Sequence, residues 1–435
     1  MRQSGASPGC CAFERMIYLS THAKQNERES LWTRDFILVI IVAFLCNTSI
    51  HMMNTTMAPY ASDMWDSKVL GGYLTSLFNA GSIAMAFACG WLANKLGRRN
   101  CLVLCAALFG LPTFLLVGTK APALALLVRF MQGTSKGMLY VAAAAMVSDV
   151  TPQSRMAEGM SLYYVGSTIG FAVGPYLGLL LSDVGYNVMF VICASLTLLS
   201  GVFSFFINYE KRDPERYRLA AKASDPRYRG IWKLIEKKAI PASINYAISF
   251  ASTSCVLIFL TVFSREMLGF TSLQICMFYT VAGVAMLILR FTAGKAADRY
   301  GPFTMILPGH AAIFILLALF LLPSLKDHYW LYLVAGAMWG VSTAAISPII
   351  NAMAILYSPL RRNGEANATF GFVQDFGILF ASLTFGNIIG GAPTTAQGYR
   401  RMFLVCVVIA TVSLVMALNL FNNRYRDKAI AARED

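Results

Sequence analysis

Four residues between positions 129 and 140 combine polarity with a helical spacing that could do chemistry. They follow the pattern i, i+3, i+7 and i+11, which places them on one face of a helix: Arg129, Gln132, Lys136 and Tyr140. Charged groups inside an apolar segment are costly, and they usually face a cavity or a partner. This face is therefore expected to bind a polar substrate, and a structural ion pair is the alternative for Lys136.

Asp375 is the one carboxylate that lies well inside an apolar stretch, next to Gln374. Burial favours the protonated form of a carboxylate, whereas a nearby cation favours the charged form. A proton and Lys136 can therefore compete for Asp375, which is a workable switch for exchanging protons against a substrate. We expect Asp375 to couple protons. His51 is a second candidate because histidine titrates near neutral pH.

Further polar side chains recur at helical spacing in other apolar segments. One group is in the first segment and two are in the second half of the chain: Asn47, His51 and Asn54; Asn245, Ser249 and Ser252; Thr343, Ser347 and Asn351. They predict a polar cavity, and hydrogen bonding between helices is the alternative. Arg290 either binds an anionic group or extends towards the membrane surface.

The elements that must position these residues are transmembrane helices. The chain has 435 residues, of which 57% are hydrophobic and 13% are charged, whereas a soluble domain carries roughly 25% charged residues. A helical span needs about 20 apolar residues. Twelve such stretches are predicted: 36–58, 70–94, 101–118, 122–148, 160–182, 186–208, 240–264, 273–297, 303–322, 329–357, 366–391 and 402–421. We expect an all-α membrane protein with twelve transmembrane helices in two pseudo-symmetric six-helix bundles.

The distribution of charge orients this bundle. The net charge is +14, and most lysines and arginines fall on the side of both termini, which is typical of cytoplasmic segments. This placement argues against nucleic-acid binding and favours contact with membrane lipid. The expected parts are an N-terminal extension (1–33), an N-terminal six-helix bundle (34–208), a basic cytoplasmic linker (209–238), a C-terminal six-helix bundle (239–421) and a cytoplasmic tail (422–435).

A joint of glycines and cations occurs once in each half. It reads Gly-Trp-Leu-Ala-Asn-Lys-Leu-Gly-Arg-Arg at 90–99, and Gly-Lys-Ala-Ala-Asp-Arg-Tyr-Gly at 294–301. Each copy closes one apolar segment and opens the next. Repeats of this kind between two parallel halves are a feature of transporters.

The first joint and two further motifs resemble those of the major facilitator superfamily. Residues 90–99 resemble its loop 2–3 motif, with Asn94 in place of the usual aspartate. Residues 129–133 resemble its span-4 motif R-x-x-Q-G, and residues 170–178 resemble its span-5 motif G-x-x-x-G-P-x-x-G. The resemblance implies a two-bundle transporter whose spans 1, 4, 7 and 10 line the path. It also links Arg129 to proton transfer and the span-5 motif to proton-coupled antiporters.

The joints are expected to control gating, with Arg98 pairing with Asp149 across the bundle; charges that only set topology are the alternative. The residues expected to act there are Gly90, Asn94, Gly97, Arg98, Arg99, Asp149, Gly294, Asp298, Arg299 and Gly301. The antiporter motif comprises Gly170, Gly174, Pro175 and Gly178. Its glycines repeat every fourth residue, which suits either close static packing or a moving interface.

These features predict a secondary active transporter of the inner membrane that exports a small organic molecule in exchange for protons. Three cations and one carboxylate within spans favour an anionic or zwitterionic substrate, although a drug-like one also fits. Uptake or facilitated exchange of a sugar, nucleoside or carboxylate is an alternative, as is a membrane ligand sensor that does not transport. Neither a phosphate-binding loop nor a catalytic motif occurs, so we expect no enzyme activity, no cofactor and no metal. We expect a monomer.

Overall fold

The computed structural model describes residues 32–151, 156–208, 235–358 and 362–420. In these ranges twelve long helices are present and there is no strand, which confirms the predicted fold class. The first six are α2 (Arg34–Trp65), α3 (Lys68–Leu96), α4 (Arg98–Phe114), α5 (Pro122–Val150), α6 (Met156–Val184) and α7 (Tyr186–Phe205). The second six are α10 (Ile240–Phe263), α11 (Ser272–Tyr300), α12 (Phe303–Leu321), α13 (Tyr329–Leu356), α14 (Asn363–Gly390) and α15 (Thr395–Leu420).

The helices begin and end where local chemistry requires it. Thr33 caps α2, because its hydroxyl accepts a hydrogen bond from the Phe36 amide at 3.3 Å. The joints between α3 and α4 and between α11 and α12 each contain a glycine with positive φ, namely 84° at Gly97 and 90° at Gly301. Only glycine adopts this conformation at little cost. The repeated joint therefore makes the same tight turn in both halves.

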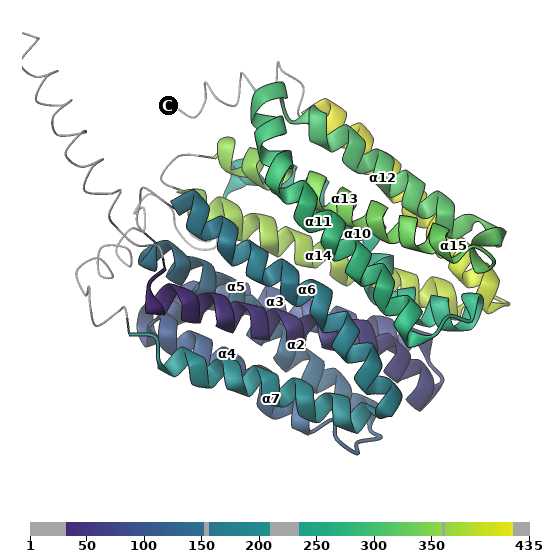
Figure 1. Cartoon of the computed structure of the whole chain (residues 1–435), viewed down its shortest axis with the longest axis horizontal. Coiled ribbons are helices and arrows are strands. Elements are labelled where there is room, and N and C mark those ends of the chain that lie inside the picture. The colour runs from purple at the N-terminus through teal and green to yellow at the C-terminus, as the bar shows by residue number, and fades with distance from the viewer. Residues whose placement is uncertain (1–31, 152–155, 209–234, 359–361, 421–435) are drawn as a thin grey trace, which may run out of the picture.

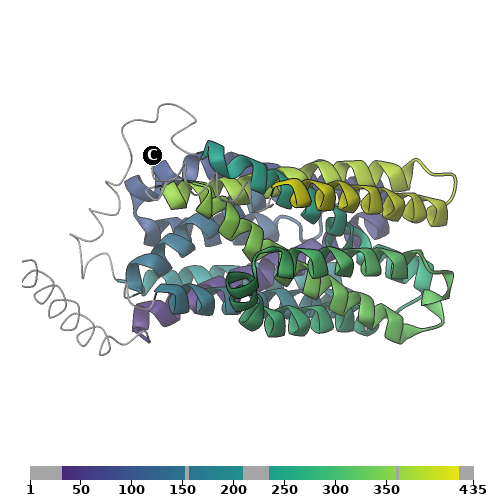
Figure 2. The same cartoon turned by 90° about the horizontal axis from the view of Figure 1, so that it is seen from above.

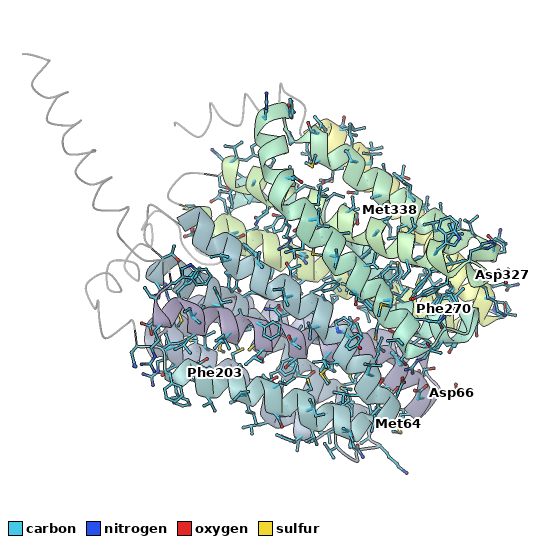
Figure 3. The ribbon with its side chains drawn as sticks, in the orientation of Figure 1. Met64, Asp66, Phe203, Phe270, Asp327 and Met338 are labelled. Atoms are coloured by element: carbon cyan, nitrogen blue, oxygen red, sulfur yellow. The ribbon has the colours of Figure 1, made fainter. Side chains whose placement is uncertain are left out.

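The two ends of the bundle are named here after the first and last residues of α2. α2 begins and α7 ends at one of them, called here the Arg34 end. α2 ends and α11 begins at the other, called the Trp65 end. Figure 3 places Met64, Asp66 and Asp327 at the Trp65 end and Phe203 towards the Arg34 end.

The helices form two groups of six with matching internal packing. In the first group α2 packs on α6, α3 on α5 and α4 on α7; in the second α10 packs on α14, α11 on α13 and α12 on α15. Figure 1 shows the purple-to-teal group beside the green-to-yellow group, and Figure 2 shows the same helices from above. Each group has its own apolar core. The predicted pseudo-symmetry is therefore present in the packing.

Within each half, a glycine brings the same pair of helices into close contact. A Cβ atom at Gly133 would collide with the backbone carbonyl of Phe78 on α3, and one at Gly340 would collide with the carbonyl of Ala282 on α11. Small residues at a helix interface allow the backbones to approach this closely. The two contacts occupy matching places, α5 on α3 and α13 on α11.

The outer surface suits a bilayer. Ten of the helices in the described ranges are long and apolar enough to span a membrane; the other two are α4, which has 17 residues, and α5. α15 exposes a row of large apolar side chains at helical spacing: Leu404, Val408, Val412 and Val415. A continuous apolar stripe of this kind is stable only against lipid or another protein. The protein is an integral membrane protein with several spans.

The halves meet mainly through three helix pairs, α3 with α14, α6 with α11 and α2 with α10. The closest contacts of α3 with α14 run from the middle of the bundle to the Trp65 end. There the Ser76 and Ser382 hydroxyls are 2.6 Å apart, and a Cβ atom at Gly72 would lie 2.5 Å from the Ser382 carbonyl oxygen. The halves are thus tightly apposed on this side.

Candidate functional site

A buried ion pair joins the two halves near the middle of the bundle. The Lys136 Nζ of α5 lies 2.7 Å from the Asp375 Oδ1 of α14. The Ser82 hydroxyl of α3 donates a hydrogen bond to the other carboxylate oxygen, Oδ2, at 2.6 Å. The side chains of Lys136 and Asp375 are 12% and 11% exposed. The first half therefore holds the carboxylate through two different groups.

The lysine has further contacts on its own half. Its Nζ donates a long hydrogen bond of 3.4 Å to the Asn79 Oδ1, and it lies 5.4 Å from the centre of the Phe78 ring. Burying two charges costs several kcal/mol per ion, which close geometry and extra hydrogen bonds must offset. The contacts from Ser82 and Asn79 fit this requirement. The structure thus forms the ion pair that the sequence offered as an alternative to substrate binding by Lys136.

Arg129 and Gln132 take part in a separate network inside the first half. Arg129 is completely buried. Its Nη2 donates to the Asn54 Oδ1 at 2.7 Å, its Nη1 donates to the Gln132 Oε1 at 2.9 Å, and Gln132 in turn donates to the Thr113 hydroxyl. Its guanidinium lies 4.2 Å from the centre of the Phe78 ring, which is the same ring that Lys136 approaches. Its Nε also donates to the Leu74 carbonyl of α3, so Arg129 joins α2, α3, α4 and α5, and no hydrogen bond or ion pair connects it to Asp375.

His51 of α2 and Tyr140 of α5 belong to the first half, as Lys136 does. The Tyr140 hydroxyl donates to the Asn47 Oδ1 at 3.3 Å. The His51 ring packs edge-on against Phe171 at 4.8 Å, and Phe171 stacks on Trp339 of the other half at 5.1 Å. His51 therefore lies beside an aromatic contact between the halves.

The predicted polar residues of the second half are dispersed. Asn245 is fully buried and donates from Nδ2 to the Ser413 carbonyl at 2.8 Å, so it joins α10 to α15. The Asn351 Nδ2 donates to the Asn367 Oδ1 at 2.9 Å between α13 and α14. Gln374 is partly exposed beside Asp375. The structure does not bring Asn245 and Asn351 to the ion pair.

The joints are described only in part. The surroundings of five predicted residues lie outside what the structure describes: Gly90, Asn94, Asp149, Gly294 and Asp298. Arg98 is the first residue of α4 and follows Gly97. The Arg99 Nη1 donates to the Asn208 Oδ1 at 3.3 Å, and Arg299 lies 5.2 Å from the Tyr300 ring centre.

The glycines of the span-5 motif pack against α2 within the first half. A Cβ atom at Gly174 would lie 2.6 Å from the Thr48 carbonyl oxygen, one at Gly178 would lie 2.8 Å from that of Met52, and Gly170 is similarly close to Phe44. Pro175 lies inside α6. This face therefore does not lie between the halves, where α6 instead meets α11 through Ala172 and Gly283.

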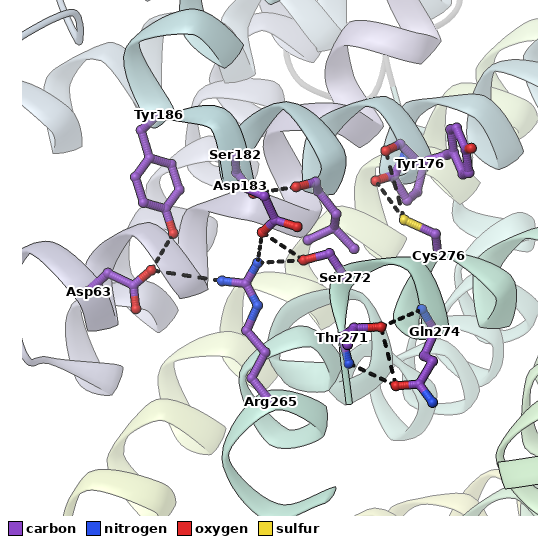
Figure 4. A network of polar contacts seen from close by, with 12 residues as sticks. Asp63, Tyr176, Ser182, Asp183, Tyr186, Arg265, Thr271, Ser272, Gln274 and Cys276 are labelled. Carbon is purple, nitrogen blue, oxygen red and sulfur yellow. Dashed lines mark hydrogen bonds and ion pairs between the residues drawn. The ribbon is translucent and has the colours of Figure 1, made fainter. Parts of the chain in front are cut away.

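A second polar network closes the Trp65 end and was missed by the sequence analysis. Arg265 follows α10 in the short helix η4 (Ser264–Leu268). Its Nη2 lies 3.0 Å from the Asp183 Oδ1, and its Nη1 lies 3.8 Å from the Asp63 Oδ2 (Figure 4). Asp183 also accepts from the Ser272 hydroxyl at 2.7 Å, and Asp63 accepts from the Tyr186 hydroxyl at 2.6 Å. Lys68 pairs with Glu266 at 2.8 Å.

This network connects α2, α3, α6 and α7 of the first half to η4 and α11 of the second. Partly exposed ion pairs contribute about 0.2–1 kcal/mol each, so the sum is enough to shift a two-state equilibrium several-fold. The sequence did contain a signal for this network. Residues of opposite charge occur where neighbouring helices begin or end at the same end of the bundle.

We expect Arg265→Gln to loosen the Trp65 end. Spin labels at Val184 and Leu273, which are 74% and 50% exposed on opposite halves, should show a larger population at long distances in pulsed electron paramagnetic resonance. The eight cysteines of the described ranges are buried, and Cys10 and Cys11 can be replaced by serine. Lys326→Gln removes an exposed cation elsewhere in the second half and is the control. Identical distance distributions for Arg265→Gln and native protein would contradict the prediction.

The comparison with known families decides what kind of membrane protein this is. A family model, Major Facilitator Superfamily, matches residues 39–382. The chain belongs to the major facilitator superfamily. Among curated superfamily members, the chain is 25% identical over 416 residues to the multidrug resistance protein MdtG of Escherichia coli (strain UMN026), covering 92% of this chain and 97% of that protein. It is 19% identical over 391 residues to an uncharacterized MFS-type transporter of Methanocaldococcus jannaschii, covering 87% and 97%.

Solved major facilitator structures share the fold. The nucleoside transporter NupG aligns with a TM-score of 0.71 at 14% identity, covering 88% of this chain and 99% of that one. A bacterial homologue of the lysosomal transporter Spinster, in an inward-facing and unoccupied conformation, aligns with a TM-score of 0.71 at 15% identity, covering 93% and 99%. These matches establish the transporter fold of the superfamily.

Proposed function

We propose that this transporter exports a small anionic or zwitterionic organic molecule, or a drug-like one, in exchange for protons. The Arg34 end is assigned to the cytoplasm because most cations of the chain fall on that side. This assignment puts both termini in the cytoplasm. We propose that the protein acts as a monomer and that its membrane is the inner membrane. The multidrug resistance protein MdtG among the curated relatives supports export.

The observation that carries the proposal is the Lys136–Asp375 pair between the halves. Protonation of Asp375 removes its charge and therefore its attraction to Lys136. An anionic substrate group on Lys136 can break the same contact by displacing the carboxylate, because a buried lysine needs a partner. The proton and the substrate are thus two alternative ways to break one contact, and each acts in its own half of the cycle, as exchange requires.

The same contact can drive alternating access. Asp375 is held by Lys136 of α5 and Ser82 of α3, so protonation weakens the contact of α14 with the first half. The proposal assigns His51 to the proton path because it lies beside the Phe171–Trp339 contact. It assigns Arg129 the role of fixing the first half around Lys136 rather than of exchanging protons itself, since arginine stays protonated.

The accessibility of the two ends favours substrate entry from the Arg34 end. The Trp65 end is closed by the Arg265 network. Towards the Arg34 end, Tyr140 is 39% exposed and Tyr164 is 40% exposed, although both lie within long transmembrane helices. A Cβ atom at Gly371, one turn of α14 from Asp375, would meet nothing within 4 Å. The space beside the ion pair therefore opens towards the proposed cytoplasmic side.

The test uses everted membrane vesicles that contain the protein. An acidic interior should drive accumulation of anionic or zwitterionic compounds from a panel that also includes neutral and cationic ones, and a protonophore should abolish the accumulation. Vesicles that lack the protein are the control. Equilibration without accumulation would indicate facilitated exchange, loss of compound from an acidic interior would indicate uptake in the cell, and binding without flux would indicate a sensor.

A further inference from the structure

Arg290 is a charged residue of α11 that forms no ion pair with the residues that the structure describes. It is partly buried within a transmembrane helix, and its Nε is a buried atom with no hydrogen-bond partner. None of the ion pairs in the described part of the chain includes it. A charge held inside a span without a partner is costly, and such residues mark functional sites. Lys136 differs in this respect because Asp375 already neutralises it.

Three tyrosines from both halves lie within electrostatic range of this guanidinium. Tyr246 of α10, Tyr164 of α6 and Tyr140 of α5 all interact electrostatically with Arg290. Tyr140 also interacts with Asp375, so the cluster adjoins the ion pair. An arginine that merely extended to the membrane surface would lie among lipid headgroups. Arg290 instead lies among groups of both halves.

The cluster includes an aromatic stack and two partly exposed phenol rings. The Tyr246 ring stacks on Phe370 with 4.6 Å between the centroids and 15° between the planes. Tyr140 and Tyr164 are about two-fifths exposed and belong to the opposite half. A ligand bound at this cluster would meet a cation, phenol hydroxyls and ring faces together.

We propose that Arg290, with Tyr140, Tyr164 and Tyr246, binds the carboxylate of an aromatic organic acid. This inference rests on the proposed function, because it names the class of molecule that the transporter exports. The planar guanidinium matches a carboxylate with two parallel hydrogen bonds. The phenols of Tyr164 and Tyr246 can donate further hydrogen bonds, whereas that of Tyr140 already donates to Asn47. Aromatic faces favour a planar ligand body. The ligand then lies beside the Asp375–Lys136 pair, where its charge can compete with that of Asp375.

The test measures binding to purified protein in detergent, without a membrane or a proton gradient. The probes are 2-naphthoate, the neutral 2-naphthylmethanol and the aliphatic cyclohexanecarboxylate. Native protein should bind 2-naphthoate more tightly than either of the others. Arg290→Gln should weaken 2-naphthoate binding by about tenfold to a hundredfold, because a hydrogen-bonded charge is lost, and should leave binding of the alcohol unchanged.

Two variants control for charge and for geometry. Arg400→Gln removes an exposed cation near the Trp65 end and should bind 2-naphthoate like native protein. Arg290→Lys keeps the charge but loses the planar fork, so its affinity should fall between those of native protein and Arg290→Gln. Native-like binding of 2-naphthoate by Arg290→Gln would overturn the inference, as would a native protein that does not distinguish it from the alcohol. Equal binding of cyclohexanecarboxylate would overturn the aromatic part.

The binding experiment can fail while the flux experiment succeeds, and the reverse is also possible. If everted vesicles show no proton-driven flux but binding of 2-naphthoate requires Arg290, the site stands and the export mechanism fails. If proton-driven flux occurs for other compounds and 2-naphthoate does not bind, the site fails and the export mechanism stands.

Discussion

Asp375→Asn should reduce proton-driven accumulation in everted vesicles to the level reached without a gradient, while exchange of substrate across the membrane continues. An asparagine keeps the size of the side chain and its contact with Ser82 but cannot bind and release a proton. Without the negative charge, Lys136 also loses the partner that it holds at 2.7 Å. The carrier then cycles without being driven. The measurement compares gradient-driven accumulation with counterflow of labelled substrate in the same vesicles.

Two further variants make this result specific. Asp327→Asn changes an exposed aspartate at the Trp65 end (Figure 3) and should leave both activities intact. Asp375→Glu keeps a group that can be protonated and should retain part of the driven flux. Unchanged driven accumulation in Asp375→Asn would remove Asp375 from the coupling mechanism.

Gly133→Ala should destabilise the folded transporter strongly. The added methyl group would collide with the Phe78 carbonyl of α3, which is backbone and cannot turn away. Overpacking of this kind typically costs about 1–3 kcal/mol and sometimes more. Phe78 also contacts Arg129 and Lys136, so a shift of α3 should disturb the site as well. The measurement is the thermal unfolding midpoint of purified protein in detergent.

The chain offers matched controls for this variant. Gly371→Ala adds the same methyl group to a helix at a place where nothing lies within 4 Å, so it should keep the midpoint or raise it slightly, because alanine is the better helix former. Gly340→Ala creates the equivalent collision with Ala282 in the second half and should behave like Gly133→Ala. An unfolding midpoint of Gly133→Ala equal to that of Gly371→Ala would show that α3 and α5 are packed less closely than described.

The helices could be predicted from the sequence because each apolar stretch must be long enough to cross a bilayer. The predicted span 122–148 became α5, Pro122–Val150, and the glycines of both joints adopt positive φ. The pairing of Lys136 with Asp375 was also within reach. A single carboxylate in an apolar interior needs a cation as its partner, and Lys136 is one of the three that the spans offer.

Other parts of the site depend on which neighbouring helix each helix face contacts. The spacing of residues along one helix does not predict that neighbour. Asn245 lies on a polar stripe, yet it bonds to Ser413 of α15 instead of facing the ion pair. Ser82 holds Asp375, but a single serine in an apolar span carries no signal of its own. The charges around Arg265 were not identified as a network, because their meeting requires that helix ends from both halves converge.

Exchange of protons against substrate is the central claim, and proton movement tests it most directly. Liposomes containing the purified protein and a pH-sensitive dye are loaded with a compound that the everted vesicles accumulate, and diluted into medium at the same pH without it. Exit of the compound should carry protons inwards and acidify the interior, and Asp375→Asn should show exit without acidification. Exit of the compound from native liposomes with no change in internal pH would contradict the account.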